Sequence, residues 1–412
     1  MTSGLINKYG PWVMGDEFFN RETEARRLSE LIDEGNNILI VAPRRVGKTS
    51  LVRETFRRME ERNRDYLLFV DVQHCSTPQD VIISLSLAIQ PYAHLWDKVT
   101  DTFKIFFKQL ESVTIFDNLE IKLREGLTGD WQAKGQKIFH NLAQADRPLT
   151  ICLDELPIML TRLLQPTAQE TYEAKRREAD VFLSWLRQVM LQYQDKLRFI
   201  ICGSIGLEPI LKRHKLSHTI TQLRPFPLDP WSRETAELCL NALGKRYGVE
   251  WRNESRHALL EDLGSYLPHH VQMFFGLLHE DCAKRHVLCP SPEDVERVYR
   301  TSMLSTRGHA ELATYEERLL SVLEPEAVPL ALDLLTEAAV VGELTSESAR
   351  QLMQRTQLAD PEAVLREVLD VLQHDGYLAW NDEAKAWQFV SRLVKNWWKK
   401  RFQLSYVSLQ ER

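Results

Sequence analysis

The stretch from Val41 to Ser50 constrains this sequence most, because it places Gly47-Lys48-Thr49 directly after an apolar run. Such a loop between a buried strand and a helix is typical of phosphate binding through backbone N–H groups at a helix N-terminus. Lys48 would reach the outer phosphates as a catalytic cation, and the Thr49 hydroxyl would bind Mg²⁺. The predicted nucleotide-binding residues are Pro43, Arg44, Arg45, Val46, Gly47, Lys48, Thr49 and Ser50.

A second apolar run, Leu149–Leu153, ends in Asp154 and Glu155. Strand ends of this kind lie beside the phosphate loop in open α/β sheets. Asp154 is therefore a predicted Mg²⁺ ligand, directly or through water. Glu155 is a predicted catalytic residue that orients and polarises the attacking water, because hydrolysis needs a proton acceptor near the γ-phosphate. The alternative is that both acids only cap the following turn.

A third polar position follows the run Leu197–Cys202, where Ser204 lies between two glycines. Ser204 is a candidate catalytic sensor of the γ-phosphate, although serine is also common in strand-end turns for turn geometry alone. No Asn-Lys-x-Asp segment that would read guanine occurs in the sequence. The expected cofactors are therefore ATP and Mg²⁺.

Short apolar runs alternate with helical patterns through the first half of the chain. Runs this apolar suit strands buried on both faces, and the alternation indicates crossover helices on a parallel sheet. The predicted fold class is α/β, with a P-loop NTPase (AAA-like) parallel sheet core. The predicted strands are Ile38–Ala42, Tyr66–Val70, Leu149–Leu153 and Leu197–Cys202, with helices at Pro78–Ile89 and Val181–Leu191 and a turn near Gly126–Asp130.

The pattern changes at Arg224–Pro230, where three prolines favour extended backbone and oppose a continuing helix. Amphipathic segments beyond it predict a helical lid, and helices followed by a short hairpin with a turn at Asn381-Asp382 predict a C-terminal winged-helix domain. The predicted lid helices are Thr235–Gly244, Arg256–Gly264 and His269–His279. The predicted domains are a P-loop ATPase core at 1–228, a helical lid at 229–308 and a winged-helix domain at 309–412.

Composition narrows the classes of partner. The net charge of -6 means that contact with nucleic acid would need a local basic surface. The six cysteines contain no CxxC pair and are expected to be reduced thiols. No apolar stretch approaches the roughly 18 residues of a membrane helix, and residues 1–10 lack a signal pattern. A cytoplasmic protein without membrane contact is expected.

These motifs together make the chain resemble the prokaryotic "archaeal ATPase" family, in the STAND branch of AAA-type P-loop NTPases. The phosphate loop and the acidic strand end are the specific parts of the likeness, which runs nearly end to end. The resembling segments are Phe18–Glu22, Val41–Leu51, Val70–Val72, Leu153–Pro157, Gly203–Gly206, Arg224–Leu228, Asp375–Leu378, Phe389–Arg392 and Trp397-Trp398.

The resemblance implies a core, a lid and a winged helix whose arrangement changes with nucleotide state, and slow hydrolysis of ATP to ADP and phosphate. Larger STAND proteins carry an effector and a repeat-built sensor, which this chain lacks, so separate protein partners are expected and a homo-oligomer is possible. The side chains of Arg44 and Arg45 are expected in solvent, because the loop binds phosphate through its backbone. Arg187, Arg213 and Arg224 are candidate arginine fingers, each more simply a surface or packing arginine.

Two other functions remain open: an ATP-driven nucleic-acid remodeller, and a non-hydrolysing adaptor that uses nucleotide as a structural ligand. The basic segment Ser391–Arg401 is relevant to the nucleic-acid remodeller, because its cations could line a nucleic-acid surface. These cations are Arg392, Lys395, Lys399, Lys400 and Arg401. We favour a packed helix in which Leu393, Val394 and one tryptophan are buried and the charges are solvated, because a groove-reading helix usually precedes the wing. The winged helix is thus predicted mainly to dock on the nucleotide domain, with weak, non-specific DNA binding.

Overall fold

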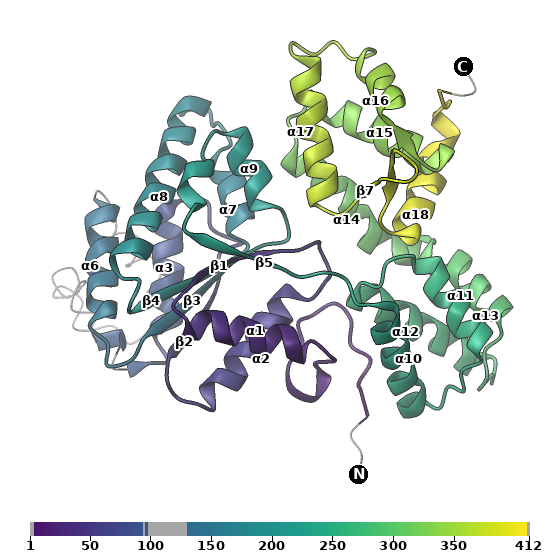
Figure 1. Cartoon of the computed structure of the whole chain (residues 1–412), viewed down its shortest axis with the longest axis horizontal. Coiled ribbons are helices and arrows are strands. Elements are labelled where there is room, and N and C mark those ends of the chain that lie inside the picture. Colours follow the sequence, from purple (N-terminus) through teal and green to yellow (C-terminus); the bar gives the residue numbers. More distant parts are fainter. Residues whose placement is uncertain (1–3, 94, 98–129, 410–412) are drawn as a thin grey trace. The chain divides into compact units, whose positions relative to one another are not determined.

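The computed structural model describes residues 4–93, 95–97 and 130–409 (Figure 1). The chain forms two compact units, which we call the α/β unit and the helical unit. The α/β unit comprises Arg21–Val41 and Leu51–Pro227, and the helical unit comprises Met1–Asn20, Ala42–Ser50 and Leu228–Arg412. The predicted turn near Gly126–Asp130 lies outside the described residues except for Asp130.

A parallel five-stranded sheet in the order β2-β3-β4-β1-β5 forms the centre of the α/β unit. Four strands confirm the predicted apolar runs to within one residue. The fifth was not predicted, because its prolines were interpreted only as a border. Proline is tolerated in this strand because it lies at the sheet edge, where one row of N–H groups is not needed for pairing. The strands are β1 (Asn37–Val41), β2 (Tyr66–Asp71), β3 (Leu149–Asp154), β4 (Leu197–Cys202) and β5 (Leu223–Pro227).

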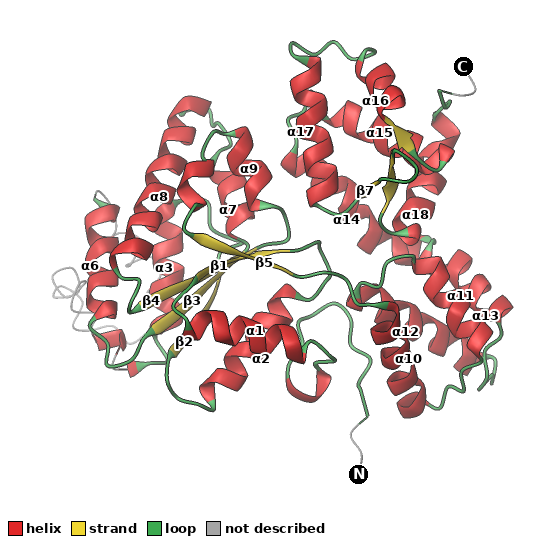
Figure 2. Ribbon diagram, viewed as in Figure 1, coloured by secondary structure: helices red, strands yellow, loops and turns green. Residues whose placement is uncertain are grey.

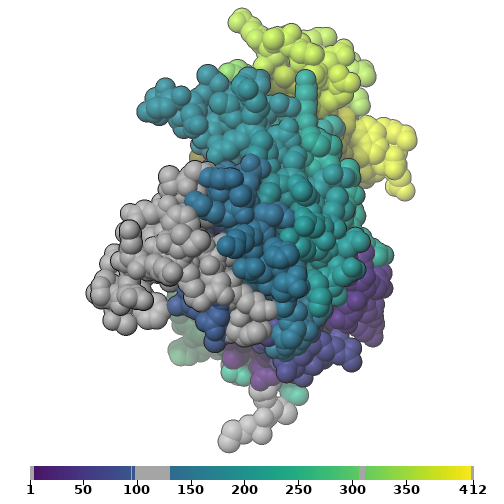
Figure 3. Space-filling view, turned by 90° about the vertical axis from the view of Figure 1, so that its left-hand side faces the viewer, coloured from purple at the N-terminus to yellow at the C-terminus, as the bar shows by residue number. Residues whose placement is uncertain are grey.

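Helices cover both faces of this sheet (Figure 2). The helices α1 and α2 lie on one face, and α7, α8 and α9 lie on the other. The predicted helix Pro78–Ile89 is confirmed as α3, where Thr77 and Asp80 form a reciprocal capping box. Figure 3 shows the outer surface of the unit on the side of α6. The helices are α1 (Glu22–Asp33), α2 (Lys48–Glu60), α3 (Pro78–Ile89), α6 (Trp131–Ala143), α7 (Leu156–Leu163), α8 (Tyr172–Gln192) and α9 (Leu207–Arg213).

The helical unit begins its long C-terminal part with four helices that contain the predicted lid segments. Serine caps set two of the helix starts: Ser232 accepts from the Thr235 N–H, and Ser291 forms a capping box with Asp294. The helices are α10 (Arg233–Tyr247), α11 (Asn253–Leu263), α12 (Pro268–Lys284) and α13 (Pro292–Val298), followed by a π-helical turn at Tyr299–Met303.

The C-terminal part is a winged helix, in which helix, strand, two helices and a two-stranded wing follow one another. Its antiparallel sheet has the order β6-β8-β7. The predicted hairpin corresponds to β7 and β8, which are separated by a turn that begins after Asn381. Gly376, with a left-handed φ of 77°, separates the end of α17 from β7. The elements are α14 (Thr306–Val322), α15 (Val328–Val341), β6 (Leu344–Thr345), α16 (Ser346–Met353), α17 (Pro361–His374), β7 (Leu378–Asn381), β8 (Ala386–Phe389) and α18 (Arg392–Phe402).

The last helix, α18, packs within the helical unit against α15 and α11. Trp397 and Trp398 are both fully buried, one more than predicted. Their burial follows from the contacts of α18 on two sides, because the Trp398 indole N–H also donates to Thr336 of α15 at 3.1 Å. In the part of the chain that the structure describes, no helix has the length and apolarity to cross a membrane.

Candidate nucleotide-binding site

The loop from Ala42 to Ser50 leaves the carboxyl end of β1 and runs into α2, which begins at Lys48. Its backbone turns through left-handed conformations at Arg45 (φ 64°) and Gly47 (φ 98°). The Lys48 ammonium donates to the carbonyl oxygens of Ala42 at 3.1 Å and Pro43 at 2.9 Å. The loop therefore curls around its own lysine at the N-terminus of a 13-residue helix, a geometry that suits an anion.

The arginines of this loop contact the C-terminal part of the helical unit. Arg45 forms an ion pair with Glu311 of α14, and the ring of His269 in α12 lies 3.4 Å from the same carboxylate. The contact with His269, together with the nearby charges of Arg45 and Arg44, lowers the pKa of Glu311 to about 2. Glu311 is thus ionised at neutral pH. We call Arg44, Arg45, His269 and Glu311 the loop–α14 cluster.

The loop–α14 cluster carries more positive than negative charge. Burial, and then the neighbouring guanidinium groups of Arg45 and Arg318, lower the pKa of Arg44. The sequence-based expectation that both arginine side chains lie in solvent is therefore corrected. Two adjacent cations facing a single carboxylate are a favourable environment for a further anion.

Pro43 lies close to the start of the wing. A Cβ atom at Gly376 would come within 3.1 Å of the Pro43 Cβ, so this position favours glycine both for space and for its left-handed φ. Beside it, a buried ion pair at 3.4 Å joins Asp375 to Arg318 of α14. The next residue, Tyr377, donates its hydroxyl to the Tyr315 carbonyl at 2.6 Å. The loop, α14 and the start of the wing thus form one connected set of contacts.

Asp154 is the last residue of β3 in the α/β unit and is buried. Its register partner on β4 is Cys202, whose thiol donates to Asp154 Oδ1 at 3.1 Å. Arg53 of α2 stacks its guanidinium 3.9 Å from the centroid of the Phe69 ring. Burial lowers the pKa of Arg53, and the charge of Asp154 opposes this effect. The Asp154 carboxylate is a hard oxygen donor of the kind that Mg²⁺ prefers.

Glu155 and Ser204, which the sequence places far apart, are brought together at the ends of β3 and β4. The Glu155 Oε2 atom accepts from the Ser204 N–H at 2.8 Å and from its hydroxyl at 2.9 Å. Glu155 has a left-handed φ of 62° at the start of α7, and its own N–H donates to the Cys202 carbonyl at 2.9 Å. Two donors on one oxygen fix the direction of this carboxylate.

The other predicted site residues have less specific surroundings. Val46 is buried, and the Ser50 hydroxyl accepts from the Val13 N–H at 3.1 Å. Of the candidate finger arginines, Arg224 lies on the edge strand β5 and pairs with Glu34 at 3.4 Å, as an ordinary surface arginine does. Sequence reasoning missed Arg53, Cys202, His269 and Glu311, because none of them belongs to a recognisable motif.

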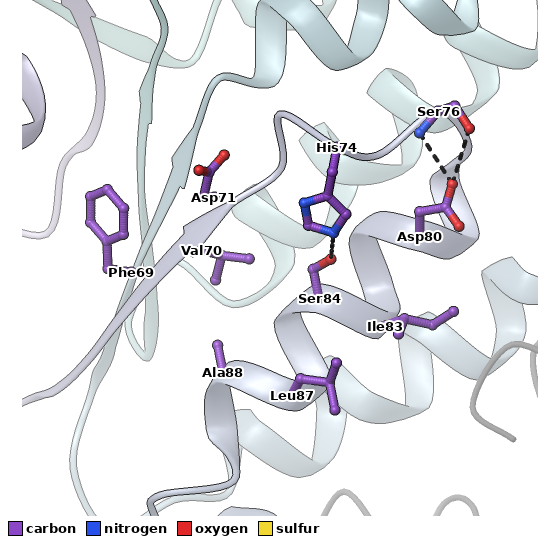
Figure 4. Close-up of a pocket in the computed structure, with 10 residues that line it drawn as sticks. All are labelled: Phe69, Val70, Asp71, His74, Ser76, Asp80, Ile83, Ser84, Leu87 and Ala88. Atoms are coloured by element: carbon purple, nitrogen blue, oxygen red, sulfur yellow. Dashed lines mark hydrogen bonds between the residues drawn. The ribbon is translucent and has the colours of Figure 1, made fainter. Parts of the chain in front are cut away.

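A separate pocket of about 350 Å³ lies beside β2 and α3 (Figure 4). It contains none of the predicted site residues. Its polar groups bind one another: the His74 ring lies 3.3 Å from the Ser84 hydroxyl, and Asp80 accepts from the Ser76 N–H at 3.1 Å. The pocket is therefore distinct from the site that the sequence motifs predict.

Comparison with known proteins identifies the class of fold. No family model and no curated protein matches the sequence. Among solved structures, the Walker-type ATPase PABY2304 of Pyrococcus abyssi superposes with a TM-score of 0.62 at 14% identity, covering 95% of this chain and 99% of that one. The ORC2 protein of Aeropyrum pernix, solved as ADPNP–ADP complexes, superposes with a TM-score of 0.53 at 14% identity, covering 96% and 97%.

The fold is therefore the P-loop NTPase fold, with an AAA-like parallel sheet core, a helical lid and a winged helix. The expectation of this fold class is confirmed. The likeness at this level of identity concerns architecture alone, and the STAND branch within it remains a hypothesis.

Proposed function

We propose that this protein is an ATP-binding and ATP-hydrolysing conformational switch that acts on separate protein partners. The observation that carries the proposal is the ion pair between Arg45 of the phosphate loop and Glu311 of α14. Through it, a loop suited to bind phosphate is directly connected to the helix that leads into the winged helix. A ligand can shift a conformational equilibrium only by contacting its two states differently. A triphosphate at this loop would compete with Glu311 for Arg45. It would therefore favour the conformation in which the ion pair between Arg45 and Glu311 is broken.

The roles of the individual residues follow from their chemistry. Lys48 would exchange its two carbonyl acceptors for phosphate oxygens, while the N–H groups of Gly47 and its neighbours bind the same phosphates. Asp154 and Thr49 would hold Mg²⁺, which supplies positive charge beside the phosphates when bound. Glu155 would orient the attacking water and accept its proton, and Ser204 would hold Glu155 in the required direction.

The connection between the loop and α14 can be tested with Glu311→Gln and Arg45→Met. Each removes the charge pair and leaves the loop backbone available, so nucleotide should still bind. We expect hydrogen exchange in α14 to differ between the ATP-bound and ADP-bound parent. In either variant we expect the two states to exchange equally. The charge-swapped double variant Arg45→Glu with Glu311→Arg should regain part of the difference.

The matched control is Arg300→Met, which breaks an exposed ion pair with Glu296 elsewhere in the helical unit. It should leave the nucleotide-dependent exchange of α14 unchanged. If Glu311→Gln keeps the full difference between ATP and ADP, the contact does not transmit the nucleotide state, and this version of the switch is wrong.

DNA remodelling is not the favoured function, because the winged helix carries unsuitable charges. The helix α17 precedes the wing, the usual position of a groove-reading helix, yet it carries Glu362, Glu367 and Asp370 against Arg366 alone. Two cations of α18 bind groups inside the helical unit: Lys400 donates to the Leu304 carbonyl at 3.0 Å, and Arg401 pairs with Glu316 at 2.6 Å.

We therefore expect weak binding to duplex DNA, measured by fluorescence anisotropy at two salt concentrations. A variant with Lys395, Lys399, Lys400 and Arg401 changed to Ala should bind as weakly as the parent. Thermal unfolding measures whether the variant stays folded after losing the intramolecular contacts of Lys400 and Arg401. Tight binding by the parent that falls steeply with salt and disappears in the variant would favour the nucleic-acid remodeller instead.

A further inference from the structure

Two buried cysteines lie beneath the end of β3 in the α/β unit. Cys152 on β3 and Cys202 on β4 are 3.6 Å apart at their Sγ atoms, and both are fully buried. Cys202 Sγ also donates to Asp154 Oδ1 at 3.1 Å. Cys152 and Asp154 are two residues apart on one strand and so face the same side of the sheet. Cys202 is the direct register partner of Asp154, and its thiol contacts both the Cys152 thiol and the Asp154 carboxylate.

The direction of these hydrogen bonds follows from the chemistry of the three groups. A carboxylate that binds a metal has no proton to donate, whereas a thiol carries a single one, so the Cys202 thiol is the donor in its contact with Asp154. A carboxylate is a much better acceptor than a sulfur atom, so the single proton of Cys202 points to Asp154, and Cys152 can donate in turn to the Cys202 sulfur.

We propose that Cys202 is a positioning residue for Asp154. The Cys202 thiol fixes the rotation of the Asp154 carboxylate, so that the second carboxylate oxygen has a defined direction for Mg²⁺. The inference rests on the metal role assigned to Asp154 under the proposed function. Hydrogen bonds to metal-binding carboxylates commonly tune metal affinity, because they restrict the ligand to its binding orientation. Cys152 contacts the sulfur of Cys202, whereas the hydrogen bond to the Asp154 carboxylate comes from Cys202.

The alternative interpretation is a packing role, in which Cys202 only fills space in the core, as buried free cysteines often do. The two interpretations differ in whether a hydroxyl group can take over the role of the Cys202 thiol. Serine keeps a donor at the same position, whereas alanine removes it, and both leave a similar gap where the sulfur was. A packing role therefore predicts equal effects of Cys202→Ala and Cys202→Ser, and a positioning role predicts different ones.

The experiment measures ATP binding by calorimetry at increasing Mg²⁺ concentrations. A parallel measurement in EDTA gives the affinity for ATP without the metal. For Cys202→Ala we expect the Mg²⁺ concentration at half-effect to rise roughly tenfold, with unchanged affinity for ATP in EDTA. Cys202→Ser should stay close to the parent. Cys152→Ala, which opens a gap in the same place without touching Asp154, is the matched control and should also stay close to the parent.

The outcomes separate this inference from the proposed function. Equal shifts in Cys202→Ala and Cys202→Ser, or no shift in Cys202→Ala, would overturn the positioning role while leaving ATP binding intact. If the parent binds ATP with no response to Mg²⁺, the metal role of Asp154 falls, and the inference falls with it. Should alanine prevent folding, Cys202→Val against Cys202→Thr gives the same comparison, because these two side chains differ only in the donor.

Discussion

We expect that replacing Lys48 by Ala abolishes the calorimetric signal of ATP binding in a protein that remains folded. In the structure the ammonium donates to the carbonyl oxygens of Ala42 and Pro43, and Lys48 is the first residue of α2. Charge-assisted hydrogen bonds contribute about 1.5–3 kcal/mol each, and two phosphate contacts are lost. Affinity should therefore fall by at least about 100-fold.

The control for this experiment is Lys284→Ala, which removes an exposed cation at the end of α12 and changes the net charge by the same amount. It should bind ATP as the parent does. Thermal unfolding of Lys48→Ala verifies the fold. Unchanged affinity in folded Lys48→Ala would locate the nucleotide site elsewhere and would remove the basis of the proposed switch.

The sequence predicted the centre of the fold well, because a strand buried on both faces leaves a direct pattern. Continuous apolar runs such as Leu149–Leu153 have few other structural solutions in an alternating α/β chain. The edge strand β5 escaped detection for the opposite reason. Its buried residues Leu223 and Phe226 are separated by exposed positions and prolines, which local reasoning interprets as a break.

The same contrast holds for the candidate site. Lys48, Asp154 and Glu155 could be proposed as site residues because each belongs to a short segment in which strand, loop and polar group are contiguous. Glu311 and His269 could not, because they come close to Arg45 only through the packing of helices far along the chain. Cys202 was expected only to be a reduced thiol. Its hydrogen bond to Asp154 depends on the register of β3 and β4, which a single sequence does not specify.

The contacts of Glu155 sharpen the prediction for hydrolysis. In Glu155→Gln the amide oxygen can still accept from the Ser204 N–H and hydroxyl, so the turn at the ends of β3 and β4 should keep its shape. The amide cannot accept a proton from water. We therefore expect ATP affinity to stay the same while single-turnover hydrolysis slows by about 100-fold or more, the usual contribution of a general base.

Two further variants make this result specific. Ser204→Ala removes one of the two hydrogen bonds to the carboxylate and leaves the backbone one, so hydrolysis should fall less than in Glu155→Gln, again with unchanged affinity. Glu173→Gln, at an exposed position in the first turn of α8, changes the same functional group away from the site and should hydrolyse ATP at the parental rate. If Glu155→Gln matched the parent in phosphate release, Glu155 would have no part in catalysis. Its carboxylate would then serve only to join the ends of β3 and β4 through Ser204, as the capping interpretation of this acidic pair requires.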